Sequence, residues 1–149
     1  MNCLYTTTTN YSYDEYKRFS WNLLLKRSHI IFYIILELFI LLLGCFMKNI
    51  LLIVFAVIYP IMIFLLQNRQ IKKVWTSNKV AQDMLVNFEF YDTYFVETDK
   101  SGNTKLDYSN LHKVIETKTN FYLLIAKNQG FILVKENMPE GLADFLKSI

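Results

Sequence analysis

The chain has 149 residues, of which 53% are hydrophobic, 16% aromatic and 19% charged, and its formal net charge at pH 7 is +3. Soluble domains carry about 25% charged residues, so this composition disfavours a disordered tail and a purely soluble enzyme. The charge is uneven, because residues 80–149 hold seven lysines and ten acidic residues. Most of the bases before them flank a hydrophobic segment, so we expect no compact basic face for nucleic acid.

Residues 1–29 are predicted to form an N-terminal cytoplasmic segment that ends in a helix. The stretch Ser12–Glu15 has the S-x-x-E pattern of a capping box, which places a helix start near Tyr13. The β-prone stretch Leu4–Thr8 precedes it and could add a strand to a downstream sheet.

Residues 30–66 are predicted to form a transmembrane helical hairpin. The runs 30–46 and 50–66 are each 17 residues long and almost wholly apolar, and only three residues separate them. Such a helix spans about 25 Å, and flanking residues can extend it toward the roughly 30 Å of a hydrocarbon core. A domain this small could not surround both runs with protein, so we expect two membrane spans.

The charges around the hairpin predict its orientation. Lys48 alone lies in the turn, whereas two acid-free basic blocks lie at the open end of the hairpin. By the positive-inside rule both termini are cytoplasmic, which makes the chain a multi-pass plasma membrane protein. The blocks contain Lys17, Arg18, Lys26 and Arg27 before the hairpin, and Arg69, Lys72, Lys73 and Lys79 after it.

Glu37 is the one charged residue inside the apolar runs, and a carboxylate at such a depth costs about 2.5–3.5 kcal/mol. A hairpin turning at Lys48 places it opposite Tyr59, beside Pro60. We therefore expect an intramembrane polar contact in which a neutral Glu37 bonds to Tyr59 or to a carbonyl freed by Pro60. A contact to a second copy or another membrane protein, and proton or ion handling, remain the alternatives.

Residues 67–83 are predicted to form a juxtamembrane stalk. Ile71, Val74 and Trp75 keep helical spacing beyond the second span. If the helix before the first span continues in the same register, Trp21 lies across from Trp75, and the two helices form a paired stalk.

Residues 84–149 change to the alternating pattern of β-strands, as in Val86, Phe88 and Phe90. Six short strands separated by turn residues predict an antiparallel barrel or sandwich. Pro139 opens a C-terminal helix with one apolar stripe, which would plug such a barrel. The fold class is therefore an α+β membrane protein, a two-helix transmembrane hairpin plus a small pleckstrin-homology-like β domain. The stripe consists of Leu142, Phe145, Leu146 and Ile149.

The motifs of this C-terminal segment resemble the YcxB-like family. They are the segments Tyr108–Leu111, Val114–Thr117, Phe121–Leu123 and Lys127–Lys135. Family members are small bacterial membrane proteins with two spans followed by a YcxB-like domain, and they often have Pro where this chain has Val134. The resemblance implies this architecture, with no enzymatic activity and no established ligand.

No residue pattern points to catalysis, a cofactor or a metal. His29 and His112 stand apart without further ligands, and Cys3 and Cys45 have neither metal-site nor disulfide-framework spacing. We therefore expect free thiols and a non-enzymatic interaction or scaffold module held at the bilayer of a bacterial inner membrane, with a protein or peptide partner or a homo-oligomer. The alternatives are self-protection against a membrane-active peptide, and an accessory subunit of a transporter.

Overall fold

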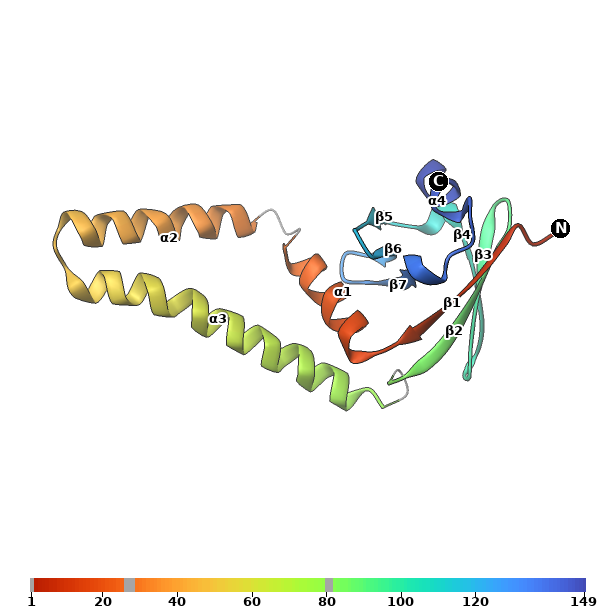
Figure 1. The fold of residues 1–149 in the computed structure, drawn as a ribbon, viewed down its shortest axis with the longest axis horizontal. Coiled ribbons are helices and arrows are strands. Elements are labelled where there is room, and N and C mark those ends of the chain that lie inside the picture. Colours follow the sequence, from red (N-terminus) through yellow and green to blue (C-terminus); the bar gives the residue numbers. More distant parts are fainter. Residues whose placement is uncertain (1, 26–28, 80–81) are drawn as a thin grey trace. The chain divides into compact units, whose positions relative to one another are not determined.

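The computed structural model describes residues 2–25, 29–79 and 82–149, without the side chain of His29, and these form seven strands and four α-helices (Figure 1). The strands are β1 (Tyr5–Tyr11), β2 (Met84–Phe90), β3 (Tyr94–Asp99), β4 (Gly102–Asp107), β5 (Lys113–Glu116), β6 (Asn120–Ala126) and β7 (Gln129–Val134). The helices are α1 (Tyr13–Leu25), α2 (His29–Phe46), α3 (Ile50–Ser77) and α4 (Leu142–Ser148). The predicted basic residues Lys26 and Arg27 lie outside the described residues.

The chain divides into two compact units. The β unit comprises Met1–Phe19 and Asn78–Ile149, and the hairpin unit comprises Ser20–Ser77. Residues 1–19 were predicted as part of a separate N-terminal segment, yet they group with the strands. The N-terminal strand expected at Leu4–Thr8 is therefore an integral part of the β unit, and it extends to Tyr11.

Two antiparallel sheets build the β unit, as the alternating sequence pattern predicted. The first has the order β1-β2-β3-β4 and the second the order β5-β6-β7. In β1 and β2 of the first sheet alternate residues are buried, so one face is packed and the other is solvated. Strand β1 joins the sheet along its full length, from Tyr5 opposite Phe90 to Tyr11 opposite Met84.

A phenylalanine-rich core lies between the sheets. The Phe131 ring of β7 meets the Phe95 ring of β3 edge-on, with centroids 5.4 Å apart. Fully buried side chains from both sheets and from α4 complete the cluster. These include Phe88, Phe90, Phe95, Phe121, Leu123, Leu133, Leu142 and Leu146.

Strand β6 is buried on both faces, which explains its nearly continuous apolar sequence. Phe121 and Leu123 point into the core, whereas Tyr122 points to the opposite face. There the first half of α1 covers it, with the Phe19 ring edge-on to Tyr122 and centroids 5.1 Å apart.

The C-terminal helix begins later than predicted. The sequence placed its start at Pro139, but α4 begins at Leu142. Gly141 precedes it with φ 85°, a left-handed conformation that a continuous helix does not contain. The predicted apolar stripe is also buried only in part, because Leu142 and Leu146 are buried whereas Ile149 is 42% exposed.

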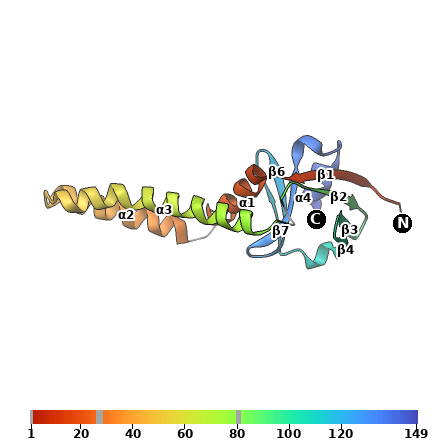
Figure 2. The same ribbon diagram turned by 90° about the horizontal axis from the view of Figure 1, so that it is seen from below.

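In the hairpin unit, α2 and α3 run side by side and antiparallel, as both views show (Figures 1 and 2). Asn49 caps α3, because its side-chain oxygen accepts hydrogen bonds from the backbone N–H groups of Leu51 and Leu52. Gly44 permits close approach of the helices, since a Cβ there would lie 3.0 Å from Cγ1 of Ile53.

Among the described residues, α3 alone is long and apolar enough to cross a membrane by length and composition. The 18 residues of α2 reach about 27 Å, short of a hydrocarbon core of about 30 Å. Helix α2 meets the same criterion only when it is counted together with α1. The structure thus contains one candidate span where two were predicted.

The predicted pairing of Trp21 with Trp75 is wrong in register. The Trp21 indole N–H donates a 3.2 Å hydrogen bond to Oδ1 of Asn68, and its ring stacks on Phe64 with centroids 5.2 Å apart. Asn68 lies two helical turns before Trp75. The prediction assumed one continuous helix through the first span, whereas α1 ends at Leu25 and α2 starts at His29.

Candidate functional site

A groove of about 460 Å³ opens in the β unit between β5 and α4. Its volume lies within the 300–1,000 Å³ of typical binding pockets. Apolar and charged side chains line it together, and polar groups make up the larger part of its exposed surface. The lining residues are Tyr108, Leu111, His112, Lys113, Val114, Glu116, Phe121, Leu146, Lys147 and Ile149.

Tyr108 is a fixed wall of this groove. Its hydroxyl donates a 2.7 Å hydrogen bond to the Tyr91 carbonyl, and its ring stacks on Phe95 with centroids 6.2 Å apart. Burial raises the pKa of Tyr108 above its ordinary value, so the phenol stays protonated at neutral pH. This wall is therefore neutral and preorganised.

Lysines surround the one carboxylate of β5. Glu116 Oε1 lies 2.6 Å from Nζ of Lys135 and 3.6 Å from Nζ of Lys147. The hydrogen bond from Lys135 lowers the pKa of Glu116, which keeps this exposed carboxylate ionised. Lys147 also lies 3.6 Å from Asp144 Oδ1. In the part of the chain that the structure describes, Lys113 forms no ion pair.

Strand β5 lies at an edge of its sheet, because β6 is its only strand neighbour among the described residues. The Thr117 N–H donates to the Asn120 carbonyl, which closes a two-residue hairpin loop and fixes the hydrogen-bonding alternation. By that alternation Val114 and Glu116 direct their backbone N–H and C=O groups away from β6. The groove therefore borders a strand edge with unused main-chain donors and acceptors.

The groove residues lie in a segment that a protein-family model matches. Residues 90–149 match the family model described as YcxB-like protein. This segment, called the YcxB-like domain, is similar to that family. This match confirms the family resemblance predicted from the sequence. Neither the curated proteins nor the solved structures gave a match to the chain.

The β unit also contains residues that lie outside the matched segment. Strand β1 and most of β2 form half of its first sheet. Tyr11 of β1 accepts a 3.1 Å hydrogen bond from the Ile132 N–H of β7, so β1 contacts the second sheet as well. The folded β unit is therefore larger than the family match.

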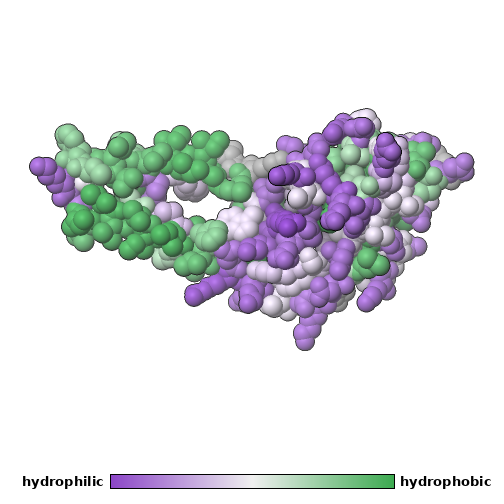
Figure 3. All heavy atoms as spheres, viewed as in Figure 1, coloured by the Kyte–Doolittle hydropathy of each residue, from purple (hydrophilic) through white to green (hydrophobic). Residues whose placement is uncertain are grey.

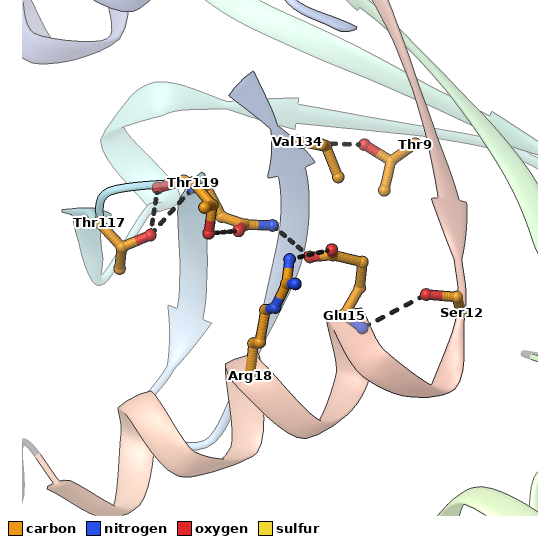
Figure 4. Close-up of polar contacts among 8 residues, drawn as sticks. Thr9, Ser12, Glu15, Arg18, Thr117, Thr119 and Val134 are labelled. Atoms are coloured by element: carbon orange, nitrogen blue, oxygen red, sulfur yellow. Dashed lines mark hydrogen bonds and ion pairs between the residues drawn. The ribbon is translucent and has the colours of Figure 1, made fainter. Parts of the chain in front are cut away.

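A buried polar network attaches α1 to the YcxB-like domain (Figure 4). Asn120, which is fully buried, donates through its side-chain amide to Glu15 Oε2. The other oxygen of Glu15 accepts a 2.7 Å hydrogen bond from Arg18, and the Glu15 N–H donates to Oγ of Ser12. The capping pattern thus starts the helix as predicted, but the Glu15 carboxylate also serves a tertiary contact that local sequence does not reveal.

Glu37 and Tyr59 were the predicted polar pair of the hairpin. Oε1 of Glu37 is buried and has no hydrogen-bond partner, while the ring of Tyr59 stacks on Phe55 with centroids 5.4 Å apart. The structure therefore gives this oxygen of Glu37 none of the hydrogen bonds that we expected from Tyr59 or a free carbonyl.

Sequence reasoning missed the groove, since it treated His112 only as an isolated histidine. The groove arises from a four-residue edge strand and a helix that starts 26 residues after it, and no local pattern records their meeting. Within the described ranges no group of three or more His, Cys, Asp and Glu residues could hold a metal ion. Cys3 and Cys45 are free and exposed.

Proposed function

We propose that this chain is a non-enzymatic interaction module, tethered by α2 and α3 to the inner face of a bacterial plasma membrane. The observation that carries the proposal is the apolar surface of the hairpin unit (Figure 3). Leu42 and Ile50 are each 67% exposed, and most of their apolar neighbours are exposed as well. A continuous apolar surface of this kind marks an interaction with a membrane or a partner.

Helix length and charge support insertion of both helices. The 19 residues from Ile50 to Asn68 precede the first charge of α3 and span about 28 Å, close to the thickness of a hydrocarbon core. Helix α2 falls about 3 Å short, a mismatch that local thinning of a bilayer can absorb. Trp21, bonded to Asn68, then lies at the level of the headgroups, where tryptophan is enriched.

The basic residues support cytoplasmic termini. No acidic residue occurs between Glu37 and Asp83, and Arg69, Lys72 and Lys73 are exposed on the C-terminal part of α3. The turn of the hairpin carries Lys48 alone. The positive-inside rule therefore places the turn outside and the β unit in the cytoplasm.

The β unit supplies the interaction role. A groove beside an open strand edge suits a peptide or protein partner, and we retain the pleckstrin-homology-like architecture as part of this proposal. A role in transport or a contact to a second copy through Glu37 is less favoured, because its buried Oε1 is not presented to a partner. No described feature favours self-protection against a membrane-active peptide.

Cysteine labelling of intact cells tests the anchor and its orientation. In a Cys3→Ser, Cys45→Ala background, Lys48→Cys reports on the turn and Lys127→Cys on the exposed β6–β7 loop. A membrane-impermeant maleimide should label only the Lys48→Cys variant, and permeabilised cells should allow labelling of both. Labelling of the Lys127→Cys variant in intact cells, or of Lys48→Cys only after permeabilisation, would contradict the proposal.

A further inference from the structure

We propose that the groove between β5 and α4 binds an extended acidic segment of a partner protein, which adds as a fourth strand to the free edge of β5. This inference deepens the interaction role proposed above and rests on it. Three observations carry the inference, namely the open main-chain edge of β5, the apolar side chains beside it and the two lysines in the lining.

The edge of β5 offers the main-chain groups that an added strand needs. Val114 and Glu116 direct their N–H and C=O groups away from β6, no described strand pairs with that edge, and both residues line the groove. Each such group can pair with an extended segment, and main-chain pairing of this kind provides affinity that does not depend on sequence.

The inner face of the groove accepts apolar side chains. Phe121 and Leu146 belong to the buried core cluster, and Val114 and Leu111 pack against it at the groove. Side chains of an added strand alternate between the two faces of a sheet. Every second residue of the bound segment would therefore face the groove, where partly exposed Leu111 and Val114 offer apolar contact, and the intervening residues would face outward.

Charge selects an acidic segment. Two lysines, Lys113 and Lys147, line the groove together with one carboxylate, that of Glu116. Lys135, outside the lining, lies 2.6 Å from that carboxylate and neutralises it further. Lys135 and Lys147 both lie near the Glu116 carboxylate. Lys113, in contrast, has no carboxylate partner among the described residues. An acidic side chain of the bound segment can pair with Lys113, whereas a basic one would meet repulsion.

The other open edge of the β unit provides an internal comparison. Strand β4 ends the first sheet, yet its side chains are almost all exposed and none of them lines the groove. Non-specific pairing with any free edge would protect both strands, whereas the proposed site protects β5 alone.

Amide hydrogen exchange on the full-length protein in lipid nanodiscs tests the proposal. The probe is a short blocked peptide that alternates valine and glutamate, compared with one that alternates valine and lysine. The acidic peptide should slow exchange at Val114 and Glu116 but not along β4. Lys113→Glu should weaken its binding about five-fold or more, whereas the exposed Lys127→Glu should leave it unchanged.

Three results would overturn the inference: no protection of β5, equal protection by the basic peptide, or equal protection of β4. None of them would alter the labelling pattern of the Lys48→Cys and Lys127→Cys variants. Failure of the groove proposal and failure of the membrane anchor are thus distinguishable.

Discussion

The side-chain amide of Asn120 donates a hydrogen bond to the carboxylate of Glu15, which is 105 residues away in the chain. Asn120 is fully buried at the start of β6, and the Glu15 side chain is 13% exposed. Thr119 donates to the other end of the same amide, through Oδ1 of Asn120. This contact attaches α1 to the second sheet through an amide and a carboxylate that are largely shielded from solvent.

Loss of this amide should destabilise the β unit. Asn120→Ala leaves the buried Glu15 oxygen without its donor, so we expect the free energy of unfolding to fall by about 1–3 kcal/mol. Chemical denaturation followed by circular dichroism measures the change. Asn128→Ala, in the exposed β6–β7 loop, is the matched control and should be nearly neutral. Equal stability of both variants would show that the network contributes nothing.

Two glutamates should give opposite pH dependences. Burial raises the pKa of Glu97 above 4.5, and the nearby charge of Asp99 adds to this. Ionisation of Glu97 therefore opposes folding as pH rises from 4.5 through the folded-state pKa, and this loss of stability is absent below that window. Glu97→Gln removes this loss, so the stability of the variant relative to wild type should increase between pH 4 and pH 7.

The contribution of Glu116 to stability has the opposite pH dependence. The hydrogen bond from Lys135 lowers its pKa below 4.5, so it contributes stability that is present above pH 4.5 and lost as pH falls through the folded-state pKa. Glu116→Gln should therefore cost stability at pH 7 and little in strong acid. Denaturation series at several pH values measure the stability of both variants relative to wild type. If the two stability differences changed with pH in the same direction, the opposite pKa shifts of Glu97 and Glu116 would be contradicted.

Glu37 should lower the efficiency of membrane insertion, because no hydrogen bond at its Oε1 compensates for the cost of the carboxyl group. Replacing it by leucine removes the cost of the carboxyl group, so Glu37→Leu should improve the apparent insertion free energy by about 3 kcal/mol. A glycosylation-reporter assay of insertion measures this change. Tyr59→Phe is the control and should leave insertion unchanged. Weaker insertion of Glu37→Leu would reveal a stabilising contact at this carboxyl group.

The revised register of Trp21 can be tested by cross-linking. Cysteines that replace Trp21 and Asn68 should be joined by a short bifunctional maleimide, because these two side chains are in contact. Cysteines that replace Trp21 and Trp75 should join poorly, since position 75 lies about 10 Å further along the helix. The reverse preference would restore the register predicted from the sequence.

The sequence predicted the elements whose signals are local. The alternation of Val86, Phe88 and Phe90 marked β2, and Ser12 marked the start of α1. The start of α4 was misplaced because Pro139 is favoured early in helices, and sequence alone did not reveal the left-handed conformation of Gly141.

Contacts between distant segments were beyond local reasoning. The groove combines β5 with α4, and the Glu15–Asn120 bond joins residues that are 105 positions apart in the chain. Their formation depends on how the sheets and helices pack, and a single sequence records that packing only as scattered apolar positions. Trp21 shows the same limit, because its register depended on whether α1 and α2 form one helix.

The central claim is that α2 and α3 reside in the bilayer. The most direct measurement is sedimentation of cell membranes after a wash with alkaline carbonate, with the chain detected in pellet and supernatant. We expect it to remain in the membrane pellet and to enter the supernatant only after detergent is added. Release by carbonate alone, or recovery in the soluble fraction of lysed cells, would contradict the account.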